Sequence, residues 1–265
     1  MAKRSGARLG QHFLKHAWAA RALAHAARVR PGDTILEIGP GKGVLTRELL
    51  AFGPVVAIEK DESLVTHMRE TFTDEIKAGK LRIISADVRD TSPESLGLGH
   101  YVLAANIPYY ITGEIIRQFL TAESQPHTMA LLVQKEVAQR ITSSRESILS
   151  LSVKAYGVPK IIEKVSRTHF SPPPTVDSAI LVITDISKTF FDTITEDAFF
   201  RVVHAGFASK RKMLANNLST KFGKEVVMRT LATADINVKA RAENVPLEKW
   251  KVLTQLLSTR AHHAN

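Results

Sequence analysis

The chain contains no cysteine among its 265 residues, which excludes disulfide bonds, cysteine-bound zinc and thiol nucleophiles. It also lacks any apolar run near the roughly 20 residues that a helix needs to cross a bilayer. Its first residues are basic but have none of the apolar character of a secretory signal. These absences favour a cytoplasmic protein with no membrane partner.

Acidic residues are missing from one end of the chain and scarce at the other. Residues 1–32 contain seven Lys or Arg and no acid, and residues 188–265 contain thirteen basic and seven acidic side chains. The stretch between them has a slight acidic excess, although the whole chain carries a net charge of +10. A plainly solvated surface is one explanation, but basic ends around an acidic-leaning centre favour nucleic-acid binding at the ends.

Short apolar runs alternate with longer amphipathic segments in the first two thirds of the chain. Strands are predicted at 34–38, 55–58, 81–85, 101–105, 129–133, 159–165 and 178–184. Helices are predicted at 17–29, 44–52, 61–72, 112–121, 135–142 and 147–155, with Thr112 as the cap of the fourth. This alternation is typical of an α/β fold with a Rossmann-like, doubly wound and mostly parallel sheet.

From about residue 188 the strands stop. Helices are predicted at 195–207, 210–222, 224–232 and 246–259, with no strand between them. We therefore expect two domains, residues 1–187 with the sheet and residues 188–265 with a small all-helical fold.

Glycines and acids follow the first three predicted strands. The turn 39–43 (GPGKG) lacks the G-x-G-x-x-G fingerprint, since Val44 stands where the last glycine would be, and it is not a phosphate-binding P-loop. Glu37 precedes this turn, Glu59 ends the second strand and Asp87 ends the third. Each acid alone is explained by solvation or capping. Together, at one sheet edge, they predict a site for a positively charged nucleoside without phosphates, which favours S-adenosylmethionine.

The fourth predicted strand ends in Asn106-Ile107-Pro108-Tyr109. Asn106 offers an acceptor oxygen, and Pro108 has no N–H and restricts the residue before it to extended backbone. Backbone carbonyls here are candidate acceptors, and Tyr109 offers a ring face. A strand-end turn with a buried tyrosine is the simpler interpretation. The alternative is a site for a planar base with an exocyclic amino group.

Together these motifs resemble those of class I S-adenosylmethionine-dependent methyltransferases, and N-[ILV]-P-Y is typical of members that act on exocyclic amino groups. More narrowly, the chain from about residue 8 to about residue 258 resembles the KsgA (RsmA)-type family of ribosomal RNA small-subunit adenine dimethyltransferases. Supporting segments are LGQHFL at 9–14, QKEVAQR at 134–140, SPPPTVDS at 171–178, ASKRKMLANNL at 208–218 and RAEN at 241–244.

The resemblance implies an enzyme of ribosome biogenesis that dimethylates the amino groups of two adjacent adenosines near the 3′ end of small-subunit (16S) ribosomal RNA. Its co-substrate would be S-adenosyl-L-methionine. The expected cofactor-binding residues are His12, Leu14, Glu37, Gly39, Gly41, Glu59, Asp87, Val88 and Asn106. Some members carry Asn at the position of His12, a departure that leaves a backbone contact intact but not one made by the side chain.

For the chemistry, we expect the Asn106 side chain and the Pro108 carbonyl to accept hydrogen bonds from the adenine amino group. These bonds would aim the nitrogen lone pair at the methyl donor, so catalysis would rest mainly on positioning. Tyr109 is expected to stack on the base and Phe170 to cover its other face. No residues show metal-ligand spacing, so we expect no metal.

Lys210, Arg211 and Lys212 are expected in the first turn of a helix, where cations oppose the helix dipole unless a phosphate lies nearby. Residues 188–265 are accordingly expected to be an RNA-binding domain and residues 1–187 the methyltransferase domain. The expected partner of the monomeric enzyme is small-subunit ribosomal RNA or an immature small ribosomal subunit. The basic arm up to Lys15 is expected to order over cofactor or RNA.

Two rivals remain open on the sequence. One is the related large-subunit ribosomal RNA methyltransferase of the macrolide-resistance type, which the Pro-rich stretch 171–178 and the segment 208–218 disfavour. The other is a non-catalytic ribosome-assembly factor on the same fold, which the intact glycine turn and Asn106–Tyr109 disfavour. A nicotinamide dehydrogenase is disfavoured by Val44.

Overall fold

The computed structural model describes residues 12–15 and 17–258, and these divide into two compact units. The first unit runs to residue 139 and includes 157–187, while the second combines 140–156 with the chain from 188 onwards. The expected domain boundary after residue 187 is one of the points at which the chain passes from one unit to the other. Residues 140–156, expected in the first domain, pack instead with the helical unit.

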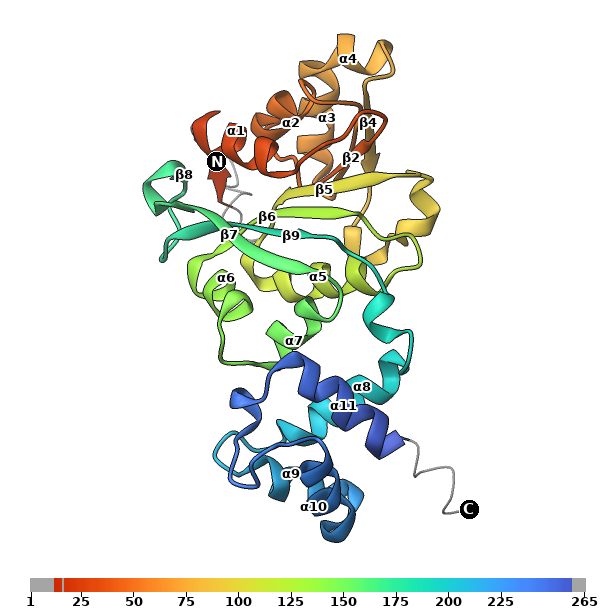
Figure 1. Ribbon diagram of the computed structural model, residues 1–265. Coiled ribbons are helices and arrows are strands. Elements are labelled where there is room, and N and C mark those ends of the chain that lie inside the picture. Colours follow the sequence, from red (N-terminus) through yellow and green to blue (C-terminus); the bar gives the residue numbers. More distant parts are fainter. Residues whose placement is uncertain (1–11, 16, 259–265) are drawn as a thin grey trace. The chain divides into compact units, whose positions relative to one another are not determined.

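The first unit contains a seven-stranded sheet in the order β4-β3-β2-β5-β6-β9-β7 (Figure 1). Its strands are β2 (Thr34–Ile38), β3 (Val55–Glu59), β4 (Leu81–Ser85), β5 (Tyr101–Asn106), β6 (Thr128–Gln134), β7 (Val158–Val165) and β9 (Ser178–Thr184). The first five in this order are parallel, while β9 runs antiparallel to β6 and to β7. The expected mostly parallel, doubly wound sheet is confirmed.

The order of the strands reverses between β2 and β5, because the chain builds outwards through β3 and β4 and then returns to pair β5 with the other edge of β2. In open α/β sheets, ligands bind beyond the carboxyl ends of the strands at such a point. The topology therefore brings the glycine turn and the end of β5 side by side.

Helices cover both faces of the sheet, with α1, α2 and α3 on one face and α5 on the other (Figure 1). The helices of this region are α1 (Ala17–Ala26), α2 (Val44–Leu49), α3 (Glu62–Thr71), α4 (Thr73–Lys77), α5 (Thr112–Thr121) and α6 (Lys135–Thr142). Leu23, Leu45 and Met68 are buried against Ala104 and Leu132 of the sheet. Small alanines on the sheet allow the helices to pack closely, which is the main stabilising burial here.

One local expectation was wrong, and one local feature had not been expected. Thr112 does not cap α5: it is the first helical residue, the N-cap position is Ile111, and the buried Thr112 hydroxyl has no partner among the described residues. The sequence also gave no sign of the antiparallel pair formed by β1 (Phe13–Leu14) and β8 (Phe170–Ser171). This pair ties the N-terminal segment to the Pro-rich stretch.

The second unit is helical, as expected. It contains α7 (Ile148–Lys154), α8 (Glu196–Gly206), α9 (Leu214–Phe222), α10 (Lys224–Thr233) and α11 (Leu247–Ser258). Trp250 is fully buried, and its indole Nε1 donates to the Val245 carbonyl at 3.0 Å. Gly206 lies under this ring, because a Cβ there would overlap Trp250. No helix within the described ranges is long and apolar enough to span a membrane.

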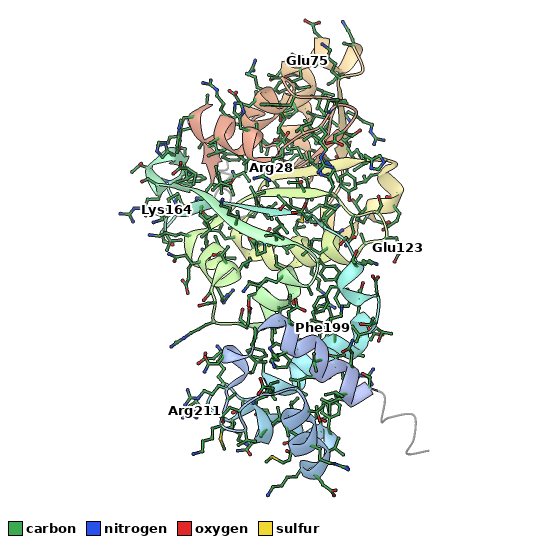
Figure 2. All side chains as sticks on the ribbon, viewed as in Figure 1. Arg28, Glu75, Glu123, Lys164, Phe199 and Arg211 are labelled. Atoms are coloured by element: carbon green, nitrogen blue, oxygen red, sulfur yellow. The ribbon has the colours of Figure 1, made fainter. Side chains whose placement is uncertain are left out.

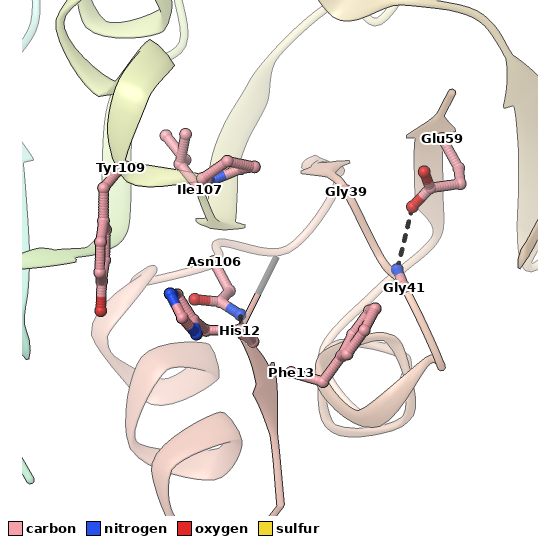
Figure 3. A pocket seen from close by; sticks show the side chains of 9 residues that line it. His12, Phe13, Gly39, Gly41, Glu59, Asn106, Ile107 and Tyr109 are labelled. Atoms are coloured by element: carbon pink, nitrogen blue, oxygen red, sulfur yellow. Dashed lines mark hydrogen bonds between the residues drawn. The ribbon is translucent and has the colours of Figure 1, made fainter. Parts of the chain in front are cut away.

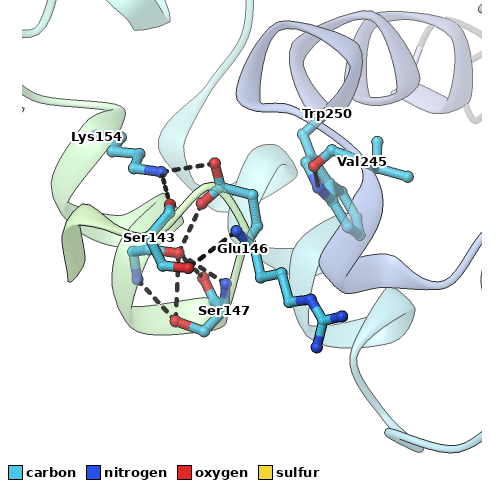
Figure 4. A network of polar contacts seen from close by, with 8 residues as sticks. Ser143, Glu146, Ser147, Lys154, Val245 and Trp250 are labelled. Carbon is cyan, nitrogen blue, oxygen red and sulfur yellow. Dashed lines mark hydrogen bonds and ion pairs between the residues drawn. The ribbon is translucent and has the colours of Figure 1, made fainter. Parts of the chain in front are cut away.

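A partly buried ion pair fixes residues 143–154 within the helical unit (Figure 4). The Glu146 carboxylate accepts from Lys154 Nζ at 2.7 Å and from Ser150 Oγ at 2.6 Å. The Glu146 N–H donates to the Glu243 carbonyl at 2.7 Å. These bonds connect the segment to the C-terminal part of the chain, which explains why the domain assignment from strand and helix order missed it.

Candidate active site

A pocket opens at the carboxyl ends of β2, β3 and β5 (Figure 3). Its lining residues are His12, Phe13, Gly39, Gly41, Glu59, Asn106, Ile107, Pro108 and Tyr109. All but Phe13 were expected in the site from the sequence, Ile107 for its backbone carbonyl. Phe13 lies inside a segment that carries the family resemblance, so position within a motif was the signal that could have found it.

The glycine turn has a backbone that favours glycine. Gly39 and Gly41 have φ values of +66° and +58°, in the left-handed region that residues with a Cβ rarely adopt. A Cβ on Gly41 would also lie 2.8 Å from the Phe13 ring. The backbone of Gly39 and Gly41 therefore lines the pocket directly, and a side chain at Gly41 would collide with Phe13.

Glu59 is buried, and three backbone N–H groups hold its carboxylate. Oε2 accepts from Gly41 at 3.1 Å, while Oε1 accepts from Lys60 at 2.9 Å and from Asp61 at 3.0 Å. A carboxylate has about four acceptor sites. The carboxylate is therefore fixed in orientation and keeps capacity for a further donor from the pocket.

Asn106 is held by the backbone of the N-terminal segment. Its Nδ2 donates to the His12 carbonyl at 2.9 Å. Because a carbonyl can only accept, this bond fixes which way the amide faces and leaves Oδ1 as the acceptor. The contact uses the backbone of His12. It therefore does not depend on the side chain at this position, where some family members carry Asn.

Tyr109 is half-buried beside His12, with ring centroids 5.6 Å apart and planes tilted by 34°. Its hydroxyl is within 2.7 Å of Ser178 Oγ. Burial raises the pKa of Tyr109, although the Ser178 hydrogen bond opposes the rise. The Pro108 carbonyl accepts from Ile111 N–H at 3.1 Å, which occupies one of its two lone pairs. The ring is thus anchored, and one Pro108 lone pair remains.

Glu37 lies behind the glycine turn and is fully buried. Thr46 Oγ1 donates to its Oε2 at 2.6 Å, and its Oε1 has no partner among the described residues. Burial raises the pKa of Glu37 to about 8, and nearby Glu59 adds to the rise. The carboxyl group is therefore mostly neutral at pH 7, and it does not line the pocket.

Asp87 and Val88 are adjacent to the site but do not line the pocket. Arg89 Nε and Nη2 donate to Asp87 at 3.1 and 2.7 Å, and Lys60 Nζ donates at 2.8 Å. Arg89 and Lys60 hold the pKa of Asp87 well below its usual range. Val88 is buried, and its carbonyl accepts from Gln118 Nε2 at 2.8 Å.

Leu14 and Phe170 face each other across the β1–β8 pair and are buried in the core. Neither lines the pocket. Phe170 is fully buried where it pairs with β1, so its ring does not reach the pocket in this arrangement, and its expected place over the second face of a base stays a prediction. The Pro-rich stretch contributes differently, through Ser178 on Tyr109 and through Pro172, whose carbonyl lies 2.8 Å from His12 Nδ1.

Lys210, Arg211 and Lys212 are exposed and precede α9, which begins at Leu214. Their expected place in the first turn of a helix is therefore wrong. Asn217 explains the difference, because its Nδ2 donates to the Gly206 and Ser209 carbonyls at 2.6 and 3.0 Å and holds the segment as a turn. Figure 2 shows Arg211 projecting from the helical unit.

No group of three or more metal-ligating side chains is found in the part of the chain that the structure describes.

The chain matches known proteins over nearly its whole length. A family model described as Ribosomal RNA adenine dimethylase matches residues 2–258. A Ribosomal RNA small subunit methyltransferase A from Dehalococcoides mccartyi is 41% identical over 253 residues, which cover 92% of this chain and 86% of the relative. A protein of the same name from Moorella thermoacetica is 38% identical, with coverage of 94% and 91%.

Two solved structures share the fold of the chain. The 23S rRNA methyltransferase ErmE is 27% identical with a TM-score of 0.75, over 93% of this chain and 99% of that chain. A dimethyladenosine transferase from Plasmodium falciparum is 23% identical with a TM-score of 0.81, over 94% of this chain and 98% of that chain. The second likeness is evidence for the fold alone.

Proposed function

Because the chain belongs to the ribosomal RNA adenine dimethylase family, and is therefore a ribosomal RNA adenine dimethyltransferase, we propose that its substrate is small-subunit ribosomal RNA. The enzyme transfers two methyl groups to the amino nitrogen of each of two adjacent adenosines near the 3′ end of that RNA. Relatives named Ribosomal RNA small subunit methyltransferase A, 34–42% identical, support the choice of the small subunit.

The pocket suits S-adenosylmethionine, which supplies a methyl group on a positively charged sulfur. The left-handed Gly39 and Gly41 leave room for a ligand against the backbone, and Glu59 keeps an acceptor site for a ribose hydroxyl. Glu37 has no ligand contact in this proposal, because its carboxyl is mostly neutral at pH 7 and does not line the pocket. Asp87 would bind an adenine amino group only by sharing its carboxylate with Arg89 and Lys60.

The hydrogen bond from Asn106 Nδ2 to the His12 carbonyl is the observation that carries the proposal. It leaves Asn106 Oδ1 as an acceptor at the pocket. The carbonyl of Pro108, two residues further along the chain, offers its remaining lone pair as a second acceptor. Two acceptors of this kind take the two N–H groups of an adenine amino nitrogen. That nitrogen is a poor nucleophile because its lone pair is delocalised into the ring, and the two bonds favour a pyramidal nitrogen whose lone pair is directed away from them.

Tyr109 stacks on the adenine, with its hydroxyl anchored at Ser178. Stacking of one base on an aromatic side chain contributes roughly 1–3 kcal/mol, and the adenine must leave any helix in which it is paired. A singly methylated amino group still has one N–H for one acceptor, which allows a second transfer. Catalysis here is positioning, with no strong acid or base among the pocket residues.

The RNA is held by its phosphates at Lys210, Arg211 and Lys212, the exposed cations of the helical unit. Their guanidinium and ammonium groups bind phosphate without reading sequence. We include in the proposal a monomeric enzyme acting in the cytoplasm on an immature small subunit, since ribosomal RNA is exposed during assembly.

The deciding experiment offers isotope-labelled S-adenosylmethionine with immature small subunits and, separately, with large-subunit ribosomal RNA. We expect dimethyladenosine at two adjacent small-subunit positions by nucleoside mapping. Label in large-subunit RNA instead would favour the rival function, methylation of large-subunit ribosomal RNA. The likeness of the chain to ErmE is the observation that supports this rival. Binding of immature subunits without any transfer would favour the non-catalytic assembly factor.

A further inference from the structure

Trp18 is a large exposed aromatic residue that the proposed mechanism does not use. It lies in the first turn of α1 and is 48% exposed. The only other tryptophan of the sequence, Trp250, is fully buried. Single exposed apolar residues are common on protein surfaces, so exposure alone gives Trp18 no function.

The surroundings of Trp18 are more specific than its exposure. One side of its indole packs against the His169 ring, with centroids 5.3 Å apart and planes tilted by 38°. This contact restricts the indole orientation before any ligand arrives. Lys15 and Arg167, both exposed, belong to the same two segments as Trp18 and His169. The Arg167 N–H donates to Asp177 Oδ1 at 3.0 Å, which anchors the backbone there. Trp18, His169, Lys15 and Arg167 are called the Trp18 cluster below.

The β1–β8 pair connects the Trp18 cluster to the active-site pocket. At the pocket end, His12 Nδ1 is 2.8 Å from the Pro172 carbonyl, and His12 also holds Asn106. At the other end, the Lys15 N–H donates to the His169 carbonyl at 2.8 Å. Three extended residues span about 10 Å, so His12 at the pocket and Lys15 beside the start of α1 are separated by about that distance along the strand.

We propose that Trp18 is a stacking platform for a base that flanks the target adenosine in the single-stranded RNA substrate. An aromatic face beside cations is how proteins bind unpaired nucleotides without reading their sequence. Lys15 and Arg167 supply charge complementary to the phosphates, and His169 holds the indole in place. The inference rests on the proposed function and adds a second base-binding position to it.

Tryptophan fluorescence tests the platform directly, because Trp18 is the exposed indole and Trp250 is a buried background. A short unpaired RNA with two adjacent adenosines is added to the full chain with S-adenosylmethionine present. We expect quenching that saturates together with binding measured by anisotropy of labelled RNA. Trp18→Ala should lose the quenching and weaken binding about tenfold, and Trp18→Phe should restore most of the affinity.

Phe52→Ala is the matched control. Phe52 is 40% exposed and packs edge-on against His25, two turns further along α1, so its loss should leave RNA affinity unchanged. If RNA binds without quenching, and Trp18→Ala binds as the wild type does, the platform is disproved while the proposed function stands. If quenching occurs but no ribosomal RNA is methylated, the proposed function fails and the platform stands. If Trp18→Ala does not fold, the wild-type quenching alone decides.

Discussion

The candidate active-site pocket and the basic turn at 210–212 contain the polar groups proposed to meet the RNA, and the two are built differently. In the pocket, each polar side chain is held by a second group: Asn106 by the His12 carbonyl and Tyr109 by Ser178. In the turn, the backbone is held, through Asn217 and through Leu214 N–H on the Ala240 carbonyl at 2.8 Å. The cations themselves extend from it exposed.

This difference follows from what each region must do. Aligning a lone pair with a methyl group fails when the reacting atoms shift by about 1 Å, a misplacement that can cost on the order of 10²-fold in rate. Attracting phosphate requires only that positive charge lies nearby, and the attraction weakens smoothly with salt. A change in the pocket should therefore alter turnover, and a change in the turn should alter RNA affinity.

The largest effect is expected from Asn106→Ala. It removes the Oδ1 acceptor and the bond to His12, so kcat should fall by about 10²-fold or more. RNA affinity should change less than about twofold, because phosphate contacts dominate it. Single-turnover methylation and RNA anisotropy measure the two quantities.

Asn216→Ala, an exposed amide on α9, is the control for Asn106→Ala and should leave both quantities unchanged. The separation between pocket and turn would break down if Asn106→Ala lost RNA affinity as strongly as turnover while its melting temperature stayed at the wild-type value.

Changing Lys210, Arg211 and Lys212 together to glutamine should weaken RNA binding by about 10- to 100-fold at low salt. The slope of log K against log salt should flatten by about 2 if the three residues neutralise three phosphates of unpaired RNA. At saturating RNA, kcat should stay near the wild-type value, because the pocket is unchanged. Binding isotherms at several salt concentrations give both numbers.

A matched triple change of Arg69, Lys77 and Lys80 to glutamine removes the same charge from exposed positions around α3 and α4. If it weakened binding as much as the change at 210–212, net charge would be responsible and the turn would have no particular role.

Much of this site was predictable because the carboxyl ends of parallel strands meet at one edge. Glu59 and Asn106 end β3 and β5, so their separation of 47 positions in the sequence disappears in the sheet. The glycine turn was predictable for the same reason. The hydrogen-bond partners of the pocket residues were not predictable. No local pattern near Asn106 indicates the His12 carbonyl, and none near Tyr109 indicates Ser178.

The differences from the expected arrangement have local physical causes. The Asp87 carboxylate already has Arg89 as a partner two residues away, a pairing whose signal was present in the sequence, so its contact with the cofactor stays a prediction. Phe170 is buried where β8 pairs with β1, and both strands have only two residues, too few to show alternation in the sequence. The helix expected from residue 210 starts later because Asn217 bonds to carbonyls that precede it. In each case a contact formed in the folded chain decided what the pattern left open.

The smallest expected effect concerns Glu37, whose burial behind the pocket raises its pKa from an ordinary 4.5 to about 8. The raised value means that folding favours the protonated carboxyl. Its stabilising contribution is complete below pH 4.5 and is lost as the pH rises towards 8. Glu37→Gln keeps a neutral group that still accepts from Thr46, so this loss should disappear in the variant.

The unliganded variant should therefore melt near the wild-type temperature at pH 5 and above it at pH 8, by roughly 2–4 °C for each kcal/mol of relief. Melting curves across this range measure the gap, with Glu70→Gln on the exposed side of α3 as a control that should show none. A gap that stays constant from pH 5 to pH 8 would mean that Glu37 is ionised despite its burial. A second ionised carboxylate would then lie behind the pocket near Glu59, and the contrast between the pocket and the cationic turn would be one of charge as well as of rigidity.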